Sequence, residues 1–93
     1  MITSGADVPR ISRFFGITIV MYYNDHTPAH FHALYAEYEV TLVIGTLEIL
    51  SGYLPRRAQA LVLEWSALHR TDLSTNWNKA REGVPLDLIA PLD

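Results

Sequence analysis

The hydrophobic period of this 93-residue chain changes at Pro55, and that change limits the folds open to it. Before Pro55, apolar residues alternate with polar ones in runs rich in β-branched and aromatic side chains, which is typical of half-buried strands. After Pro55, apolar residues recur at a spacing of about 3.6 among good helix formers. Because proline suits the first turn of a helix, the pattern predicts an α+β domain in which strands precede helices.

Three strands are expected in the first half of the chain. The first spans residues 11–23 with its odd-numbered side chains inward, and Gly16 is a candidate bulge within it. The second spans residues 30–44. Its even-numbered side chains are expected to point inward, because two glutamates at odd positions indicate a solvent-exposed face. The third spans residues 47–54 after a short turn. Together the three predict an antiparallel meander.

One amphipathic helix is expected from Arg56 to about Arg81, ended by Gly83. At 1.5 Å per residue it would be roughly 40 Å long, which exceeds the width of so small a domain. We therefore expect a meander covered on one face by one long kinked helix, or by two consecutive helices with a break near Thr71, which can cap. Residues 84–92 are expected to form an extended tail. The stripe expected to pack on the sheet consists of Ala58, Leu61, Val62, Trp65, Leu68, His69, Leu73, Trp77 and Ala80.

Composition predicts one folded domain at residues 9–93 after a flexible lead-in at residues 1–8. The chain is 49% hydrophobic and 18% charged, which is typical of a globular protein. It has no cysteine, so neither a disulfide nor a thiolate zinc site can form. Neither a signal-peptide pattern nor a run of ~20 apolar residues is seen, which predicts a cytoplasmic protein without membrane contact. The net charge of −3 argues against a general nucleic-acid coat.

Residues 25–32 concentrate the candidate chemistry of the chain. His30 and His32 are expected on the core-facing side of the second strand, near its open end. Together with His26 they could bind zinc or another divalent metal, with Asp25 or a glutamate completing the ligand set. The competing interpretation is that these histidines are structural and bond to the backbone of the turn.

A second hypothesis makes His30 or His32 the general acid/base of a small metal-independent ribonuclease, because imidazole titrates near neutral pH. Arg13, which interrupts the inward face of the first strand, would stabilise the phosphate together with Arg56 or Arg57. The last two lie at a helix start, where the helix dipole favours a phosphate or a partner's carboxylate. Alternatively, Arg13 forms a salt bridge to Glu64 or snorkels at the sheet margin, and the other two are solvated surface residues.

Aromatic side chains favour a third hypothesis, a binding surface. Tyr22 and Tyr35 are candidate contacts to nucleic-acid bases or to a protein partner. Because one helical layer covers only one face of the sheet, we expect the other face to form a protein interface, in a homo-oligomer or with a neighbouring partner. The aromatic residues considered for this surface are Phe14, Tyr22, Phe31, Tyr35 and Tyr53.

Several separated motifs resemble those of one bacterial family. In order, they are RISRFFGI at 10–17, MYYNDH at 21–26, HFH at 30–32, LPRR at 54–57, LEW at 63–65 and NW at 76–77. In this order and spacing the chain resembles the family called domain of unknown function 4160, from residue 9 to the C-terminus. One departure is Thr27-Pro28-Ala29, where family members often have two prolines.

The resemblance implies a protein partner and an RNA-directed activity. Members of the family are often encoded beside a second small protein, in a pair that looks like a toxin–antitoxin module. The resemblance implies no catalytic residue. Three functions therefore stay open: the toxin-like half of such a module acting on RNA, a non-catalytic protein-interaction or regulatory module, and a divalent-metal protein. No cofactor is expected except zinc or another divalent metal under the third.

Overall fold

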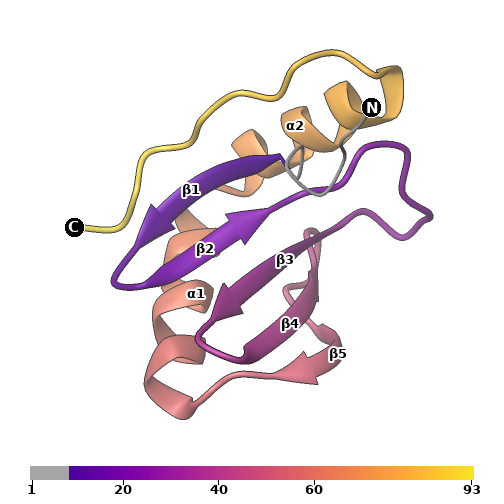
Figure 1. Cartoon of the computed structure of the whole chain (residues 1–93). Coiled ribbons are helices and arrows are strands. Elements are labelled where there is room, and N and C mark those ends of the chain that lie inside the picture. The colour runs from indigo at the N-terminus through magenta and orange to yellow at the C-terminus, as the bar shows by residue number, and fades with distance from the viewer. Residues whose placement is uncertain (1–8) are drawn as a thin grey trace.

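The computed structural model describes residues 9–93, so the predicted lead-in at residues 1–8 lies outside the described residues (Figure 1). The described chain forms a five-stranded antiparallel sheet followed by two helices. The α+β class is thus confirmed, but the prediction of three strands is wrong. The elements are β1 (Arg10–Phe14), β2 (Ile17–Val20), β3 (His30–Tyr35), β4 (Tyr38–Val43), β5 (Ile49–Tyr53), α1 (Arg56–Leu68) and α2 (Arg70–Glu82).

Two tight turns divide the first two predicted strands. Phe14 pairs with Ile17 across the β1–β2 hairpin, and Tyr35 pairs with Tyr38 across the β3–β4 hairpin. Gly16, expected to be a bulge, is instead a hairpin turn residue with φ of 80°. A two-residue turn reverses the chain and also exchanges the parity of the inward side chains. The single long strands inferred from alternation are therefore pairs of strands.

The inward face of β3 is the opposite of the one predicted. Phe31 and Ala33 are fully buried and pair with Leu42 and Val40 of β4, so the odd-numbered residues of β3 form the core. Of this strand pair, even-numbered residues form the core in β4, after the turn has exchanged the parity, while His30 at the start of β3 is buried as well. The expectation that His32 faces the core is therefore wrong.

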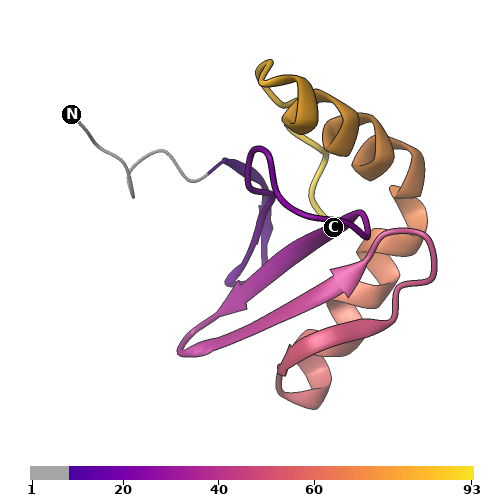
Figure 2. The ribbon, with the colours of Figure 1, turned by 90° about the vertical axis from the view of Figure 1, so that its right-hand side faces the viewer.

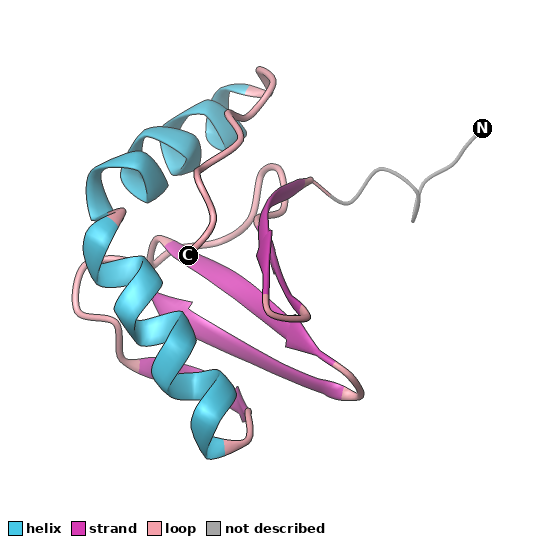
Figure 3. Cartoon of the chain, turned by 90° about the vertical axis from the view of Figure 1, so that its left-hand side faces the viewer, coloured by secondary structure: helices cyan, strands magenta, loops and turns pink. Residues whose placement is uncertain are grey.

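Both helices lie on one side of the sheet, as views from opposite directions show (Figures 2 and 3). The expected break between them is present, but it lies at His69 and not at Thr71. Gly83 ends α2 in the left-handed conformation, as predicted. Trp65 of the predicted stripe is fully buried, whereas Leu68 at the end of α1 is 68% exposed.

Trp65 anchors the core between the sheet and α1. Its ring lies 5.3 Å from that of Phe14 and 6.2 Å from that of Phe31, measured between centroids. Both phenylalanines are buried. The proposal that Phe14 and Phe31 belong to an outer binding surface is therefore wrong.

The extended tail at residues 84–92 covers the β1 edge of the sheet (Figure 1). The Ile89 amide donates to the Ile11 carbonyl at 2.8 Å, and the Trp65 indole donates to the Ala90 carbonyl at 2.8 Å. Buried Asn76 of α2 bonds both the amide and the carbonyl of Asp87. These contacts tie the tail to β1 and to both helices.

Gly52 in β5 cannot be replaced without strain. Its φ is 86°, and an added Cβ would overlap the carbonyl oxygen of Glu39 in β4. We expect Gly52→Ala to lower the free energy of unfolding by about 2 kcal/mol or more, measured by urea denaturation. Gly45→Ala is the matched control, because a Cβ there meets nothing within 4 Å. Equal destabilisation by both variants would contradict this reading of β5.

Candidate metal centre

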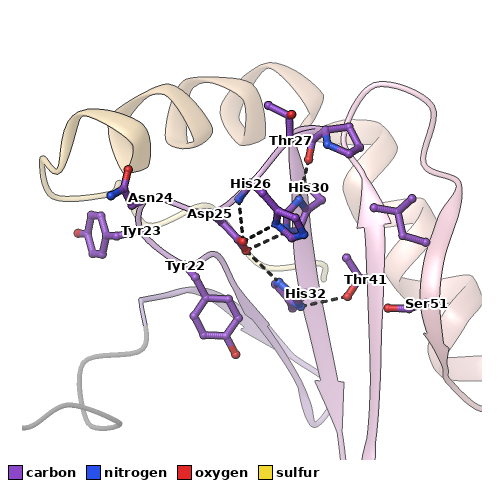
Figure 4. Close-up of a pocket in the computed structure, with 12 residues that line it drawn as sticks. Tyr22, Tyr23, Asn24, Asp25, His26, Thr27, His30, His32, Thr41 and Ser51 are labelled. Carbon is purple, nitrogen blue, oxygen red and sulfur yellow. Dashed lines mark hydrogen bonds and ion pairs between the residues drawn. The ribbon is translucent and has the colours of Figure 1, made fainter.

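The loop between β2 and β3 is held over the start of β3. The Asn24 amide donates to the Ala80 carbonyl near the end of α2 at 3.2 Å, and the Ala29 carbonyl accepts from the Ile44 amide at 3.0 Å. Asn24 has a φ of 57°, a conformation that asparagine tolerates better than most residues. Anchored at both ends, the loop presents Asp25 to the first residues of β3 (Figure 4).

Asp25 lies at the centre of the three histidines of the predicted metal site (Figure 4). Its Oδ2 lies 2.9 Å from His30 Nε2 and 3.8 Å from His32 Nε2, and its Oδ1 lies 2.8 Å from His26 Nδ1. Ligand atoms of Asp25, His26 and His30 all lie within 4.8 Å of one another. Asp25, His26 and His30 thus come together as a group that could hold an ion, and His32 lies outside that group with its Nε2 3.8 Å from Asp25 Oδ2.

Hydrogen bonds engage both ring nitrogens of His30. Its Nδ1 lies 2.6 Å from the Pro28 carbonyl oxygen, which can only accept, so Nδ1 carries a hydrogen. The other nitrogen, Nε2, faces the Asp25 carboxylate. Either a second proton or a metal cation can occupy the space between these two groups.

His32 also turns its Nδ1 to oxygen, but unlike His30 its Nε2 makes no hydrogen bond to the described residues. Its Nδ1 lies 3.1 Å from Thr41 Oγ1 and 3.3 Å from a Glu39 carboxylate oxygen. Because the carboxylate only accepts, this contact favours a hydrogen on Nδ1. The Nε2 atom is buried and has no hydrogen-bond partner among the described residues. His32 Nε2 therefore lies near Asp25 without a hydrogen bond of its own.

The charges in the site favour ionised Asp25 and neutral His32. Burial alone would raise the pKa of Asp25, but hydrogen bonds from His26 and His30, together with the charge of His30, lower it to about 2. Burial lowers the pKa of His32, as does the neighbouring His30, while Glu39 and Asp25 act in the opposite direction. Near neutral pH the site thus combines a carboxylate with a neutral imidazole.

The cluster opens into a cleft of about 570 Å³. Tyr22 lies beside the site, with its ring 4.7 Å from that of His32 between centroids. Burial, and the charges of Glu39 and Asp25, raise the pKa of the Tyr22 hydroxyl, which therefore stays protonated. The residues lining the cleft are Tyr22, Tyr23, Asn24, Asp25, His26, Thr27, Pro28, His30, His32, Thr41, Leu50 and Ser51.

The predicted phosphate-binding residues lie elsewhere. Of the residues that the structure describes, no arginine or lysine lines the cleft. Arg13 pairs with Thr18 and is exposed, so the expectation that it interrupts an inward face is wrong. Arg56 and Arg57 are exposed at the start of α1, as predicted, and Arg57 lines a small cavity with Tyr35 instead.

Sequence reasoning missed Glu39 and Thr41 as neighbours of His32. Thr41 is the direct cross-strand partner of His32, and Glu39 lies two residues before it in β4. A correct placement of the β3–β4 turn would have found both, since cross-strand pairs are fixed by the turn. These two residues could therefore have been found from the strand register, but not from a sequence motif.

The fold and the cluster define a small α+β domain with a candidate metal centre of histidine and aspartate at one end of its sheet. The chain belongs to the family described as Domain of unknown function (DUF4160), whose model matches residues 16–78. The matched region contains Asp25, the three histidines and their neighbours in β4. No curated protein and no solved structure matched the chain. Within residues 9–93, neither helix has the length and apolar character needed to cross a membrane.

Proposed function

We propose that the protein binds one divalent transition-metal ion, zinc in the first instance, through His30, His32, Asp25 and His26. One observation carries the proposal. Buried His30 and partly buried His32 each turn Nδ1 to an oxygen atom and direct Nε2 to the same carboxylate oxygen of Asp25. Metal-binding histidines in proteins have this arrangement, because the second hydrogen bond fixes the tautomer and orients the ring.

The distances suit an ion after small shifts of side chains. Two ligands of a tetrahedral zinc ion, each about 2.1 Å from the metal, are about 3.4 Å apart. The two Nε2 atoms lie 2.9 and 3.8 Å from Asp25 Oδ2, one on each side of that value. The side chain of His26 is 85% exposed and has room to rotate toward the same point.

An ion also removes an unfavourable feature of the site. Within residues 9–93 the buried Nε2 of His32 lacks a hydrogen-bond partner, and an unsatisfied buried polar atom costs about 1–3 kcal/mol. A cation between His32 and Asp25 would bind that lone pair and face a carboxylate that is already ionised. The donor set contains nitrogen and oxygen but no sulfur, which suits zinc, nickel, copper or iron better than a soft monovalent ion.

Zinc titration of metal-free protein tests the proposal. We expect one equivalent to bind per chain in competition with a chromophoric chelator, and the bound zinc to persist through gel filtration. Elemental analysis of the eluted protein measures the stoichiometry. Binding no stronger than that of a variant in which His26, His30 and His32 are all alanine would overturn the proposal.

A second candidate is the metal-independent cleavage of RNA by a toxin-like protein. It is supported by the position of His30 and His32, whose ring centroids lie 5.2 Å apart beside an open cleft. Two adjacent imidazoles can act as general acid and base, and Asp25 would orient one of them. A small protein encoded beside this one, or a second copy of the chain, would then be the partner.

Cleavage assays separate the two candidates. The RNA proposal expects cleavage that continues in excess EDTA and is lost in His32→Ala. Absence of cleavage under these conditions, or cleavage that EDTA abolishes, counts against metal-independent chemistry.

A further inference from the structure

We infer that a small molecule displaces His26, the most exposed of the four ligands, from the bound ion, and that the position opened toward the cleft takes an oxygen ligand that is neutral or singly charged. The inference rests on the metal binding proposed above and adds a ligand class to it. Structural zinc sites are closed by four protein ligands, whereas catalytic sites leave a position for water or substrate.

The protein ligands approach from two neighbouring segments only. Asp25 and His26 come from the loop before β3, and His30 and His32 come from β3 itself. Of these four, His26 is mostly exposed, so the least restrained ligand lies on the solvent side. The cleft beside them has about 570 Å³, many times the roughly 30 Å³ of one water molecule.

A row of hydroxyl groups continues from the ligands across the sheet. His32 pairs with Thr41 of β4, and Thr41 pairs with Ser51 of the edge strand β5. Leu50 beside Ser51 is half exposed and adds an apolar surface to the cleft. A ligand that is bound at the ion and extends toward β5 can therefore contact the Ser51 hydroxyl and the apolar side chain of Leu50.

The charges of the cleft select against polyanions. Among the described residues, its lining contains no lysine or arginine. Besides Asp25, a second carboxylate is close, because a Glu39 oxygen lies 3.3 Å from His32 Nδ1. Two carboxylates offset the charge of a divalent ion, so the loaded site would be nearly neutral. Nucleic acids draw their affinity from many cationic contacts. A neutral or monoanionic oxygen ligand, such as a carboxylate or a hydroxamate, suits this site better.

Cobalt-substituted protein gives a readout that needs no known reaction. Co²⁺ replaces zinc, and its visible absorption responds to any change in its ligands. We expect benzohydroxamate to shift the spectrum saturably with one site per chain. A short RNA oligonucleotide is expected to bind at least about tenfold more weakly, because it finds no cationic side chains.

A cleft variant localises the ligand. Ser51→Trp should keep one equivalent of Co²⁺ and weaken benzohydroxamate about tenfold or more by filling the cleft. Leu68→Trp, an exposed position at the end of α1, is the control and should change neither.

The possible outcomes distinguish failure of the metal centre from failure of the proposed ligand class. Failure to bind Co²⁺ would overturn the metal centre and the inference together. Stoichiometric Co²⁺ with a spectrum unaffected by benzohydroxamate would leave the metal centre standing and show that its coordination is closed. Tighter binding of the oligonucleotide than of benzohydroxamate would overturn the ligand class.

Discussion

Replacing His32 by alanine is expected to weaken zinc binding by about 100-fold or more, because loss of a ligand exceeds the 10- to 100-fold typical of losing a supporting hydrogen bond. The substitution removes the free Nε2 and leaves Asp25 with one imidazole fewer at the ion. Isothermal titration with zinc, with far-UV circular dichroism to establish folding, measures the effect. His30→Ala should act in the same direction, but His30 is only 3% exposed and its loss can also affect folding.

Matched variants show whether the effect belongs to the cluster. His69→Ala removes the fourth histidine, which pairs with Asp72 in α2, and should leave zinc affinity within about twofold. Asp25→Asn keeps the shape of the side chain but removes its charge, and should weaken zinc binding about 10-fold or more. Equal affinities of His32→Ala and His69→Ala would contradict the assignment of His32 as a ligand.

The cluster itself was visible in the sequence, but its supporting residues were not. Residues 25–32 hold three of the four histidines, and their spacing was sufficient to single them out as candidate metal ligands. Which nitrogen of each ring faces Asp25 depends on the Pro28 carbonyl and on Glu39 and Thr41. These contacts arise from strand pairing and loop conformation, which residue spacing does not reveal. Metal binding by the set stays a prediction.

The predicted strand count was wrong because the two hairpin turns lack most of the residues that usually mark a turn. Hairpin turns are usually recognised by Asn-Gly, Asp-Gly or Gly-rich pairs. The β3–β4 turn is Ala36-Glu37, and Ala36 adopts a φ of 52° without being glycine or asparagine. In the β1–β2 turn, Phe15 has a φ of 50° and only Gly16 signals a reversal. Tertiary packing of both hairpins overrides these local preferences, and a single sequence carries no trace of it.

The same missed turns explain the wrong placement of Arg13. In a single strand from residue 11 to residue 23, its parity matches that of the inward Ile17 and Ile19. The hairpin exchanges the parity, so that Arg13 pairs with Thr18 and is exposed. The helical half was predicted more closely, because the 3.6-residue stripe and Gly83 are local signals.

Trp65→Ala is expected to lower the free energy of unfolding by about 3–5 kcal/mol, the usual range for removing a buried aromatic side chain. The indole is fully buried, packs against Phe14 and Phe31, and donates to the Ala90 carbonyl. Its removal leaves a cavity between sheet and helix and also releases the tail. Urea denaturation followed by far-UV circular dichroism measures the loss.

Trp65→Phe separates packing from the hydrogen bond to the tail. Phenylalanine keeps much of the apolar volume but lacks the indole N–H, so we expect a smaller loss of about 1–2 kcal/mol. Because Trp65 packs on the helix-covered face and His32 lies on the other, zinc affinity of the folded Trp65→Phe variant should stay within about twofold of the original. Equal destabilisation by phenylalanine and alanine would instead assign the stabilising role of Trp65 to its bond with Ala90. In that case, α1 would be held against the sheet mainly through the tail and less through the aromatic core.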